Sequence, residues 1–257
     1  MISTLHLFLA AVSAFLAGGI NSVAGGGTLI TFPTLFALGL PVIAANTTST
    51  VAIWPGSVGS MWGFRREIRT IPPAMLLLAV PSVLGGLLGA ILLRCTSSAV
   101  FERLVPFLIL FATLLFTVQA PIQRRLNAIS LSSRPRGPAW MAGAMLAQFV
   151  VGVYGGYFGA GMSIMMLTAL AFMGMEDILK MSAMTSFLSF CTNGVASILF
   201  AATHMVMWPY VLAMMVAAIL GGYLAAGVAR KIGKVVVRRF VIAVGFTIAI
   251  VLFIKMV

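Results

Sequence analysis

Two glycine-dense stretches with polar side chains interrupt the long apolar runs of this sequence. Residues 18–28 read Gly-Gly-Ile-Asn-Ser-Val-Ala-Gly-Gly-Gly-Thr, and residues 152–163 read Gly-Val-Tyr-Gly-Gly-Tyr-Phe-Gly-Ala-Gly-Met-Ser. A helix that begins at Thr28 or Ser163 presents unpaired N–H groups and about half a positive charge at its first turn. Bare glycines also let a ligand approach the backbone closely. The two stretches are therefore suited to binding an anion.

A second pair of polar stretches lies further along the chain. Residues 46–49 and 55–57 read Asn-Thr-Thr-Ser and Pro-Gly-Ser, and residues 185–186 and 191–194 read Thr-Ser and Cys-Thr-Asn-Gly. Proline and glycine at these places predict a kink or an unwound turn in the helix. For Thr48, Ser49, Thr185 and Ser186 an equally good explanation is a hydroxyl that bonds its own helix backbone.

The candidate substrate-binding residues are the glycines and polar side chains of these four stretches. They are Asn21, Ser22, Gly25, Gly26, Gly27, Thr28, Thr48, Ser49, Ser57, Tyr157, Gly159, Gly161, Ser163, Thr185, Ser186, Thr192 and Asn193. No Lys or Arg lies in the middle of an apolar segment, so recognition would depend mainly on backbone dipoles. Elsewhere small residues predict only close helix packing. That reading is preferred for Gly85, Gly89, Gly221 and Ala225.

Catalysis, metal binding and cofactors are not expected from this sequence. His6 and His204 stand alone, without Cys, His or carboxylate neighbours at ligand spacing. There is no Gly-x-Ser-x-Gly motif with a positioned His, and no carboxylate pair, so an enzyme is disfavoured. All acidic residues fall in or beside the predicted loops, which leaves no buried carboxylate relay for protons. They are Glu67, Glu102, Glu176 and Asp177.

The composition places these stretches inside a membrane protein. Hydrophobic residues make up 61% of the chain and charged residues only 8%, with a mean hydropathy of +1.15. Soluble domains have about 25% charged residues. A membrane-spanning helix needs about 20 mainly apolar residues, and such segments are predicted near 4–24, 28–42, 46–64, 72–93 and 100–120, then near 138–158, 160–174, 178–203, 207–229 and 235–256. The net charge of +12 is spread over short loops, so a nucleic-acid partner is not expected.

The two sets of segments are related by an internal repeat. Three landmarks recur in the same order: Gly25-Gly26-Gly27 with Gly159-Ala160-Gly161, Thr48-Ser49 with Thr185-Ser186, and Leu84-Gly85-Gly86 with Leu220-Gly221-Gly222. Their offsets of 134, 137 and 136 residues are nearly constant, which indicates duplication. We therefore expect a first membrane repeat at 1–120, a cytoplasmic linker at 121–137 and a second membrane repeat at 138–257.

The basic residues predict that the two halves have opposite orientations. Short cytoplasmic loops are enriched in Lys and Arg. With the linker in the cytoplasm, 13 basic residues lie inside and 3 outside, and both termini are periplasmic. The loop at 64–70 has three arginines, whereas its counterpart at 203–207 has no Lys or Arg. The expected fold is therefore an all-α integral membrane protein with an inverted-topology repeat and 8–10 transmembrane helices, some broken or re-entrant.

The glycine-rich motifs resemble those of the TauE/SafE family of sulfite and organosulfonate exporters. The resemblance rests on residues 18–27, Pro33, Gly39, Thr48-Ser49 and Pro55-Gly56-Ser57, and on residues 155–161 in the second half. It implies export of a small sulfur oxyanion, such as sulfite, sulfoacetate or another organosulfonate, across the bacterial cytoplasmic (inner) membrane by alternating access. The expected partners are this anion and the lipid bilayer.

Two other functions remain open at this point. One is a channel-like anion pore, in which flux does not saturate and cannot run against a gradient. The other is a membrane assembly factor with no solute flux, although short loops offer little surface for a protein partner. The sequence does not identify the anion or the coupling ion, and it leaves the oligomeric state open, a homodimer included.

Overall fold

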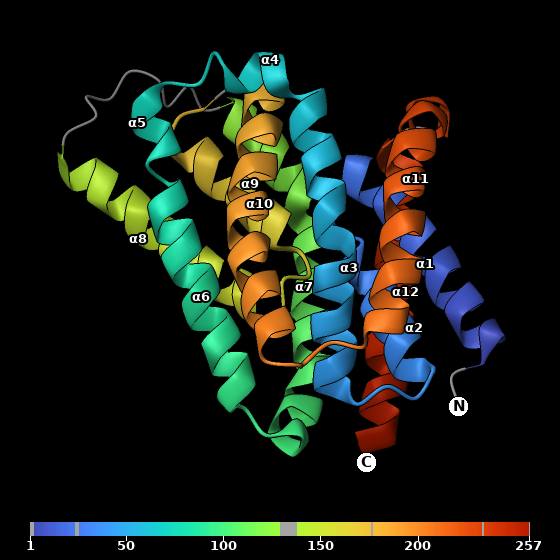
Figure 1. The fold of residues 1–257 in the computed structure, drawn as a ribbon. Coiled ribbons are helices and arrows are strands. Elements are labelled where there is room, and N and C mark those ends of the chain that lie inside the picture. The colour runs from blue at the N-terminus through green and yellow to red at the C-terminus, as the bar shows by residue number, and fades with distance from the viewer. Residues whose placement is uncertain (1–2, 24–25, 129–137, 176, 233, 257) are drawn as a thin grey trace.

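The computed structural model describes residues 3–23, 26–128, 138–175, 177–232 and 234–256, and within these ranges every regular element is a helix (Figure 1). The helices of the first half are α1 (Thr4–Val23), α2 (Thr28–Ala37), α3 (Val42–Gly63), α4 (Arg65–Ile68), α5 (Pro73–Leu76), α6 (Ala79–Cys95) and α7 (Ser98–Ala128). Those of the second half are α8 (Pro138–Tyr157), α9 (Met162–Phe172), α10 (Ile178–Ala202), α11 (Trp208–Ile232) and α12 (Lys234–Met256).

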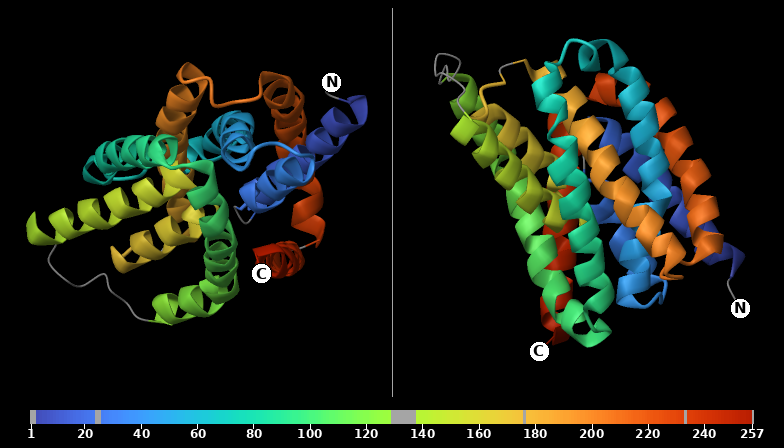
Figure 2. Two further views of the ribbon diagram at one scale, coloured as in Figure 1. Left: turned by 90° about the horizontal axis from the view of Figure 1, so that it is seen from below. Right: turned by 60° about the vertical axis from the view of Figure 1, so that its left-hand side comes forward.

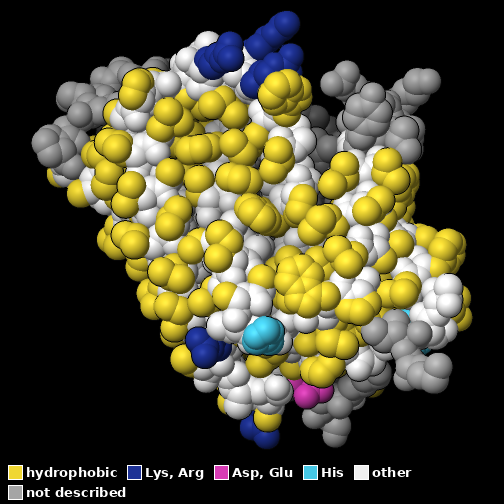
Figure 3. Space-filling view, in the orientation of Figure 1, with side chains coloured by type: hydrophobic (Ala, Val, Ile, Leu, Met, Phe, Trp, Pro, Cys, Tyr) yellow, Lys and Arg dark blue, Asp and Glu magenta, His cyan; other side chains and the backbone are white. Residues whose placement is uncertain are grey.

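Five of the described helices are long and apolar enough to cross a membrane, over Thr4–Asn21, Pro73–Cys95, Ser98–Val118, Ala139–Tyr157 and Leu179–Ala202. Shorter apolar helices lie at Thr28–Ala37, Met162–Phe172, Trp208–Gly222 and Arg239–Ile254. Hydrophobic side chains cover most of the face in Figure 3, and the visible Lys and Arg side chains gather toward its two ends. A broad apolar surface of this kind is stable only in lipid, so the protein is a multi-pass membrane protein.

Two of the four predicted interruptions are absent. The unwound turn that Pro55-Gly56-Ser57 could form is not present, because α3 is helical from Val42 to Gly63 with Pro55 inside it. The same holds for residues 191–194, which lie inside the continuous helix α10. The two helices pack on each other beside these residues: the indole N–H of Trp54 donates to the carbonyl oxygen of Phe190 at 3.2 Å, and the two rings stack.

The bounds of two predicted segments differ in the structure. Helix α7 continues to Ala128, beyond the segment end predicted near residue 120. Residues 129–137, with Arg134 and Arg136, lie outside the described residues. The segment expected at 72–93 is divided into α5 and α6. Between them the chain turns, and the N–H groups of Leu78 and Val80 donate to the carbonyl oxygens three residues earlier.

Helices from different halves pack in matching pairs. Helix α1 packs on α11, α6 on α8, α3 on α10 and α7 on α12, and Figure 2 shows the α6–α8 and α1–α11 pairs on opposite sides of a centre that contains α3 and α10. In Figure 1, α3 runs from the end where both termini lie to the end where α4 lies, and α10 runs the other way. The two termini and α4 are therefore at opposite ends of the molecule.

Glycines allow two of these pairs to approach at backbone distance. A Cβ atom on Gly85 would collide with the carbonyl oxygen of Phe149, and one on Gly89 with that of Val153, so α6 and α8 touch through their backbones. A Cβ on Gly221 would likewise collide with the carbonyl of Phe15. The prediction that these three glycines serve helix packing is confirmed, whereas the side chain of Ala225 lies outside the described residues.

Candidate functional site

The first interruption separates α1 from α2. Helix α1 ends at Val23 and α2 begins at Thr28, with Gly26 in the left-handed region at φ +93°. The side-chain oxygen of Asn21 accepts a hydrogen bond from the N–H of Gly27 at 2.7 Å, so this predicted ligand also holds the turn in place. Gly25 lies outside the described residues, as does the side chain of Ser22.

The second interruption separates α8 from α9. Helix α8 ends at Tyr157 and α9 begins at Met162, with φ +78° at Gly159 and +77° at Gly161. The Tyr154 hydroxyl donates to the carbonyl oxygen of Ala160 at 2.6 Å and fixes the turn. Within the described residues, the N–H groups of Gly161 and Ser163 meet no acceptor. The first turn of α9 therefore keeps free donors and the positive end of the helix dipole.

Helix α7 contacts both interruptions. A Cβ atom on Gly26 would collide with the ring of Phe116. A Cβ on Gly161 would lie 3.4 Å from the Cα and Cβ atoms of Ala112. Because Ala112 and Phe116 are four residues apart on one helix, they share a face and lie about 6 Å apart along the axis. Both glycine clusters thus contact α7, at residues one helical turn apart.

Most of the hydroxyl candidates on α3 and α10 already have protein partners. The Thr48 hydroxyl accepts from the N–H of Met207 at 3.0 Å, and the Ser49 hydroxyl bonds that of Thr31 at 2.5 Å. On α10, Ser186 bonds its own helix at the carbonyl of Ser182 (2.9 Å), and Thr192 donates to the carbonyl of Ser82 at 3.4 Å. These bonds link Thr48, Ser49 and Thr192 to other segments of the chain, whereas Ser186 bonds only the backbone of α10.

The remaining candidates lie in different environments. Thr28 is buried at the first turn of α2, and the Thr185 hydroxyl is buried without a hydrogen-bond partner in the described structure. Ser57 is half-buried on α3. The Tyr157 hydroxyl lies 3.4 Å from that of Thr96, and its ring packs edge-on against Phe101. Tyr157 therefore points its hydroxyl toward the end of α6.

Two buried amides were missed by the sequence reasoning. Asn46 on α3, 1% exposed, donates its amide N–H to the carbonyl oxygen of Tyr157 at 3.1 Å. Gln148 on α8, fully buried, donates to the Ser82 hydroxyl at 2.8 Å. The polar run at 46–49 signalled Asn46, but Gln148 is a single polar residue in an apolar helix. The predicted ligand Asn193 lies beside Gly159, close to the residues that Asn46 contacts.

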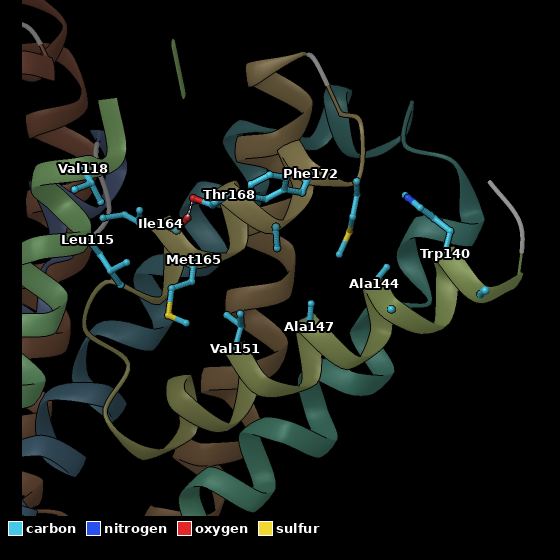
Figure 4. Close-up of a pocket in the computed structure, with 14 residues that line it drawn as sticks. Leu115, Val118, Trp140, Ala144, Ala147, Val151, Ile164, Met165, Thr168 and Phe172 are labelled. Atoms are coloured by element: carbon cyan, nitrogen blue, oxygen red, sulfur yellow. Dashed lines mark hydrogen bonds between the residues drawn. The ribbon is translucent and has the colours of Figure 1, made fainter. Parts of the chain in front are cut away.

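A cavity of about 570 Å³ lies apart from these polar groups, between α7, α8 and α9 (Figure 4). Leu115, Val151, Ile164 and Phe172 are among its apolar lining. Its lining hydroxyl, on Thr168, is already bonded to the carbonyl of Ile164 at 2.8 Å. This lining suits hydrocarbon rather than an anion. Within the described residues, no group of three or more His, Cys, Asp or Glu could hold a metal ion.

Comparison with known proteins places this architecture among membrane transporters. A probable membrane transporter protein of Haemophilus influenzae is 29% identical over 235 residues, which cover 90% of this chain and 88% of the relative. Probable membrane transporter protein ORF9 of a Sinorhizobium species is 27% identical (93% and 89% covered), and YfcA of Escherichia coli K12, also described as a probable membrane transporter protein, is 26% identical (95% and 88% covered).

No solved structure matches the chain. The family described as "Sulfite exporter TauE/SafE" matches residues 10–252, which include both interruptions and all the helices that surround them. The chain belongs to the TauE/SafE sulfite exporter family.

Proposed function

We propose that the protein exports a small sulfur oxyanion, such as sulfite, sulfoacetate or a related organosulfonate, from the cytoplasm by alternating access. One observation is central to this proposal: both interruptions contact α7, at residues one helical turn apart, and α9 begins there with unpaired N–H groups. Helix starts that meet inside a membrane protein form a site for a negative charge without a buried Lys or Arg.

The proposed binding residues are the seventeen candidates of the sequence, with different roles. The N–H groups at Gly161 and Ser163 would bind the oxyanion directly, together with the start of α2 at Thr28. Asn21 would present its amide at the first interruption. Thr48, Ser49 and Thr192 would act mainly through their contacts with other segments, and Ser186 through its bond within α10, because their hydroxyls already have partners.

An inverted repeat of the two halves, 1–120 and 138–257, would give the site its two access routes. Its support is a set of exchanged contacts: Gly221 on α11 faces the Phe15 carbonyl of α1, and Gly85 on α6 faces the Phe149 carbonyl of α8. These pairs are related by the offsets of the sequence repeat, 134 for the phenylalanines and 136 for the glycines. The opposite directions of α3 and α10 agree with the inversion (Figure 1).

The proposed location is the bacterial inner membrane, with 8–10 spans, a cytoplasmic linker and periplasmic termini. Helix α4, which contains Arg65 and Arg66, lies at the opposite end from the two termini. With the arginines placed in the cytoplasm, the start of α1 and the end of α12 face the periplasm. Export then moves the anion from the α4 end to the end where the termini lie.

The test is sulfite flux in liposomes that contain the purified protein. A transporter gives flux that saturates with sulfite concentration and that a driving gradient can move uphill. Linear, strictly downhill flux would favour the anion pore, and no flux with any sulfur oxyanion would overturn the proposal.

A further inference from the structure

The side-chain oxygen of Asn46 is a buried acceptor without a donor. Asn46 lies in α3 with 1% of its surface exposed, and its amide N–H donates to the Tyr157 carbonyl at 3.1 Å. A carbonyl only accepts hydrogen bonds, so this contact fixes which end of the amide is nitrogen. The oxygen Oδ1 takes no part in this bond, and no donor reaches it in the described structure.

The amide lies at the negative end of a broken helix. Tyr157 is the last residue of α8, where the helix dipole places about half a negative charge. Both Phe158 and Gly159 direct their N–H groups to the same carbonyl, that of Tyr154, at 2.9 and 3.1 Å. The next carbonyls, of Gly155 and Gly156, therefore receive no bond from the described residues that follow.

Other unpaired polar atoms in the described structure do not share this setting. The buried hydroxyls of Thr185 and Ser197 lack partners, but a hydroxyl has a proton of its own and can rotate toward a helix carbonyl. The free oxygen of Gln148 lies in the middle of α8, where the helix is continuous. Of these side chains, only Asn46, through its bond to the Tyr157 carbonyl, contacts the end of a helix.

We propose that this end of α8 binds a monovalent cation, with Na⁺ as the first candidate, through Asn46 Oδ1 and the released carbonyls of Gly155 and Gly156. These ligands are neutral oxygens, the kind a hard cation prefers. Mg²⁺ and Ca²⁺ sites in proteins use carboxylates, and α3 and α8 contain no acidic residue. The ligand set therefore favours a single positive charge.

The cation would lie next to the proposed anion. Only residues 158–161 separate the negative end of α8 from the positive start of α9, so the two ions would compensate each other's charge. Asn46 Oδ1 has no exposed surface in this conformation. The cation would therefore enter when the α8–α9 connection moves, which links its binding to the change of access. This coupling depends on the proposed function, whereas cation binding itself does not.

The experiment is thermal unfolding of the purified full-length protein in detergent, with chloride as the anion and no sulfur oxyanion. NaCl is compared with choline chloride at equal ionic strength, since a ligand that binds only the folded state raises its melting temperature. We expect a saturable rise with Na⁺ in the wild type. The control Thr50→Val should respond equally, because the Thr50 hydroxyl, one turn along α3, bonds only the backbone oxygen of Asn46.

Two substitutions of Asn46 decide the proposal. Asn46→Leu removes the oxygen. It should raise the Na⁺ concentration that gives half of the maximal rise in melting temperature at least about tenfold. If that variant does not fold, Asn46→Asp decides: its carboxylate should add stabilisation by Ca²⁺, which is absent in the wild type. Equal curves for Na⁺ and choline in the wild type, an unchanged Na⁺ response in Asn46→Leu, or no Ca²⁺ response in Asn46→Asp would overturn the cation site.

Sulfite flux separates this result from the proposed function. If Na⁺ stabilises the wild type but the protein transports no sulfur oxyanion, the cation site is supported and the proposed function is refuted. If the wild type transports sulfite equally well in NaCl and in choline chloride and Na⁺ does not stabilise it, the function is supported and the cation site is refuted.

Discussion

Gly26 and Gly161, from opposite halves of the chain, lie against successive turns of α7. Gly26 faces the ring of Phe116 and Gly161 faces Ala112. Both glycines have positive φ, +93° and +77°, so each marks the turn at which a membrane helix stops and a new one begins. Helix α7 thus contacts the turn before each of the two helix starts, and several of the following predictions depend on that arrangement.

Gly26→Ala should destabilise the protein more than Gly39→Ala. Both glycines have φ near +90°, so alanine costs each about 1–2 kcal/mol of left-handed strain. A Cβ on Gly39 meets nothing within 4 Å, whereas one on Gly26 collides with Phe116, which adds about 1–3 kcal/mol of overpacking. Thermal unfolding measures the difference. Phe116→Leu should restore part of the loss in Gly26→Ala, and equal melting temperatures for the two alanine variants would contradict the contact.

Gly85→Ala should weaken the α6–α8 pair, although alanine is the better helix former. The added Cβ would collide with the Phe149 carbonyl and the backbone N of Val153, and we expect a loss of about 1–3 kcal/mol. Gly59→Ala in α3 is the matched control, because nothing lies within 4 Å of its Cβ position. That control should be stabilised by up to about 1 kcal/mol. Unfolding in detergent tests both, and a stabilised Gly85→Ala would refute the close crossing.

Asn21→Asp should preserve the fold and weaken anion binding. A carboxylate at this position still accepts the Gly27 N–H that Asn21 Oδ1 accepts at 2.7 Å. It also adds a negative charge at the start of α2, and two like charges about 4 Å apart repel by about 4 kcal/mol near a protein surface. The sulfite concentration for half-maximal flux should rise at least about tenfold. An unchanged concentration dependence would place the anion away from Asn21.

Cysteine labelling should find the two ends of the molecule on opposite sides of the membrane. Ser3 and Arg66 are both exposed and lie at different ends. In a background with Cys95→Ser and Cys191→Ala, a membrane-impermeant maleimide should label Ser3→Cys in intact cells. It should label Arg66→Cys only after the membrane is permeabilised. The reverse pattern would invert the proposed orientation, and with it the direction of export.

The helix boundaries at the two interruptions could be predicted because their signal is local. Glycine and polar residues at 18–28 and 152–163 disfavour a continuous membrane helix wherever they occur, and the helices end at Val23 and Tyr157 as those stretches require. Proline and glycine at 55–57 give a similar local signal, but α3 is helical through them and packs on α10 there, with Trp54 against Phe190. A local signal alone does not separate these two cases.

The contact of both interruptions with α7 and the partners of the buried amides could not be predicted, because they depend on contacts between distant residues. Asn46 finds its partner 111 residues away, and Gln148 finds Ser82 at a distance of 66 residues. A single amide in an apolar helix has no periodic pattern that identifies its neighbour. The same is true of Ala112 and Phe116, which look like ordinary apolar residues of α7 until both interruptions are seen to pack on them.

Equilibrium binding of radiolabelled sulfite to the purified protein tests the central claim most directly. Gly161→Leu and Gly39→Leu both place leucine at a positive φ, but only at Gly161, directly before α9, does the added side chain meet a neighbour, Ala112 of α7. We predict saturable binding to the wild type and to Gly39→Leu, and binding weakened at least about tenfold in folded Gly161→Leu. Equal affinity in the two leucine variants would contradict the claim that the meeting helix starts hold the anion.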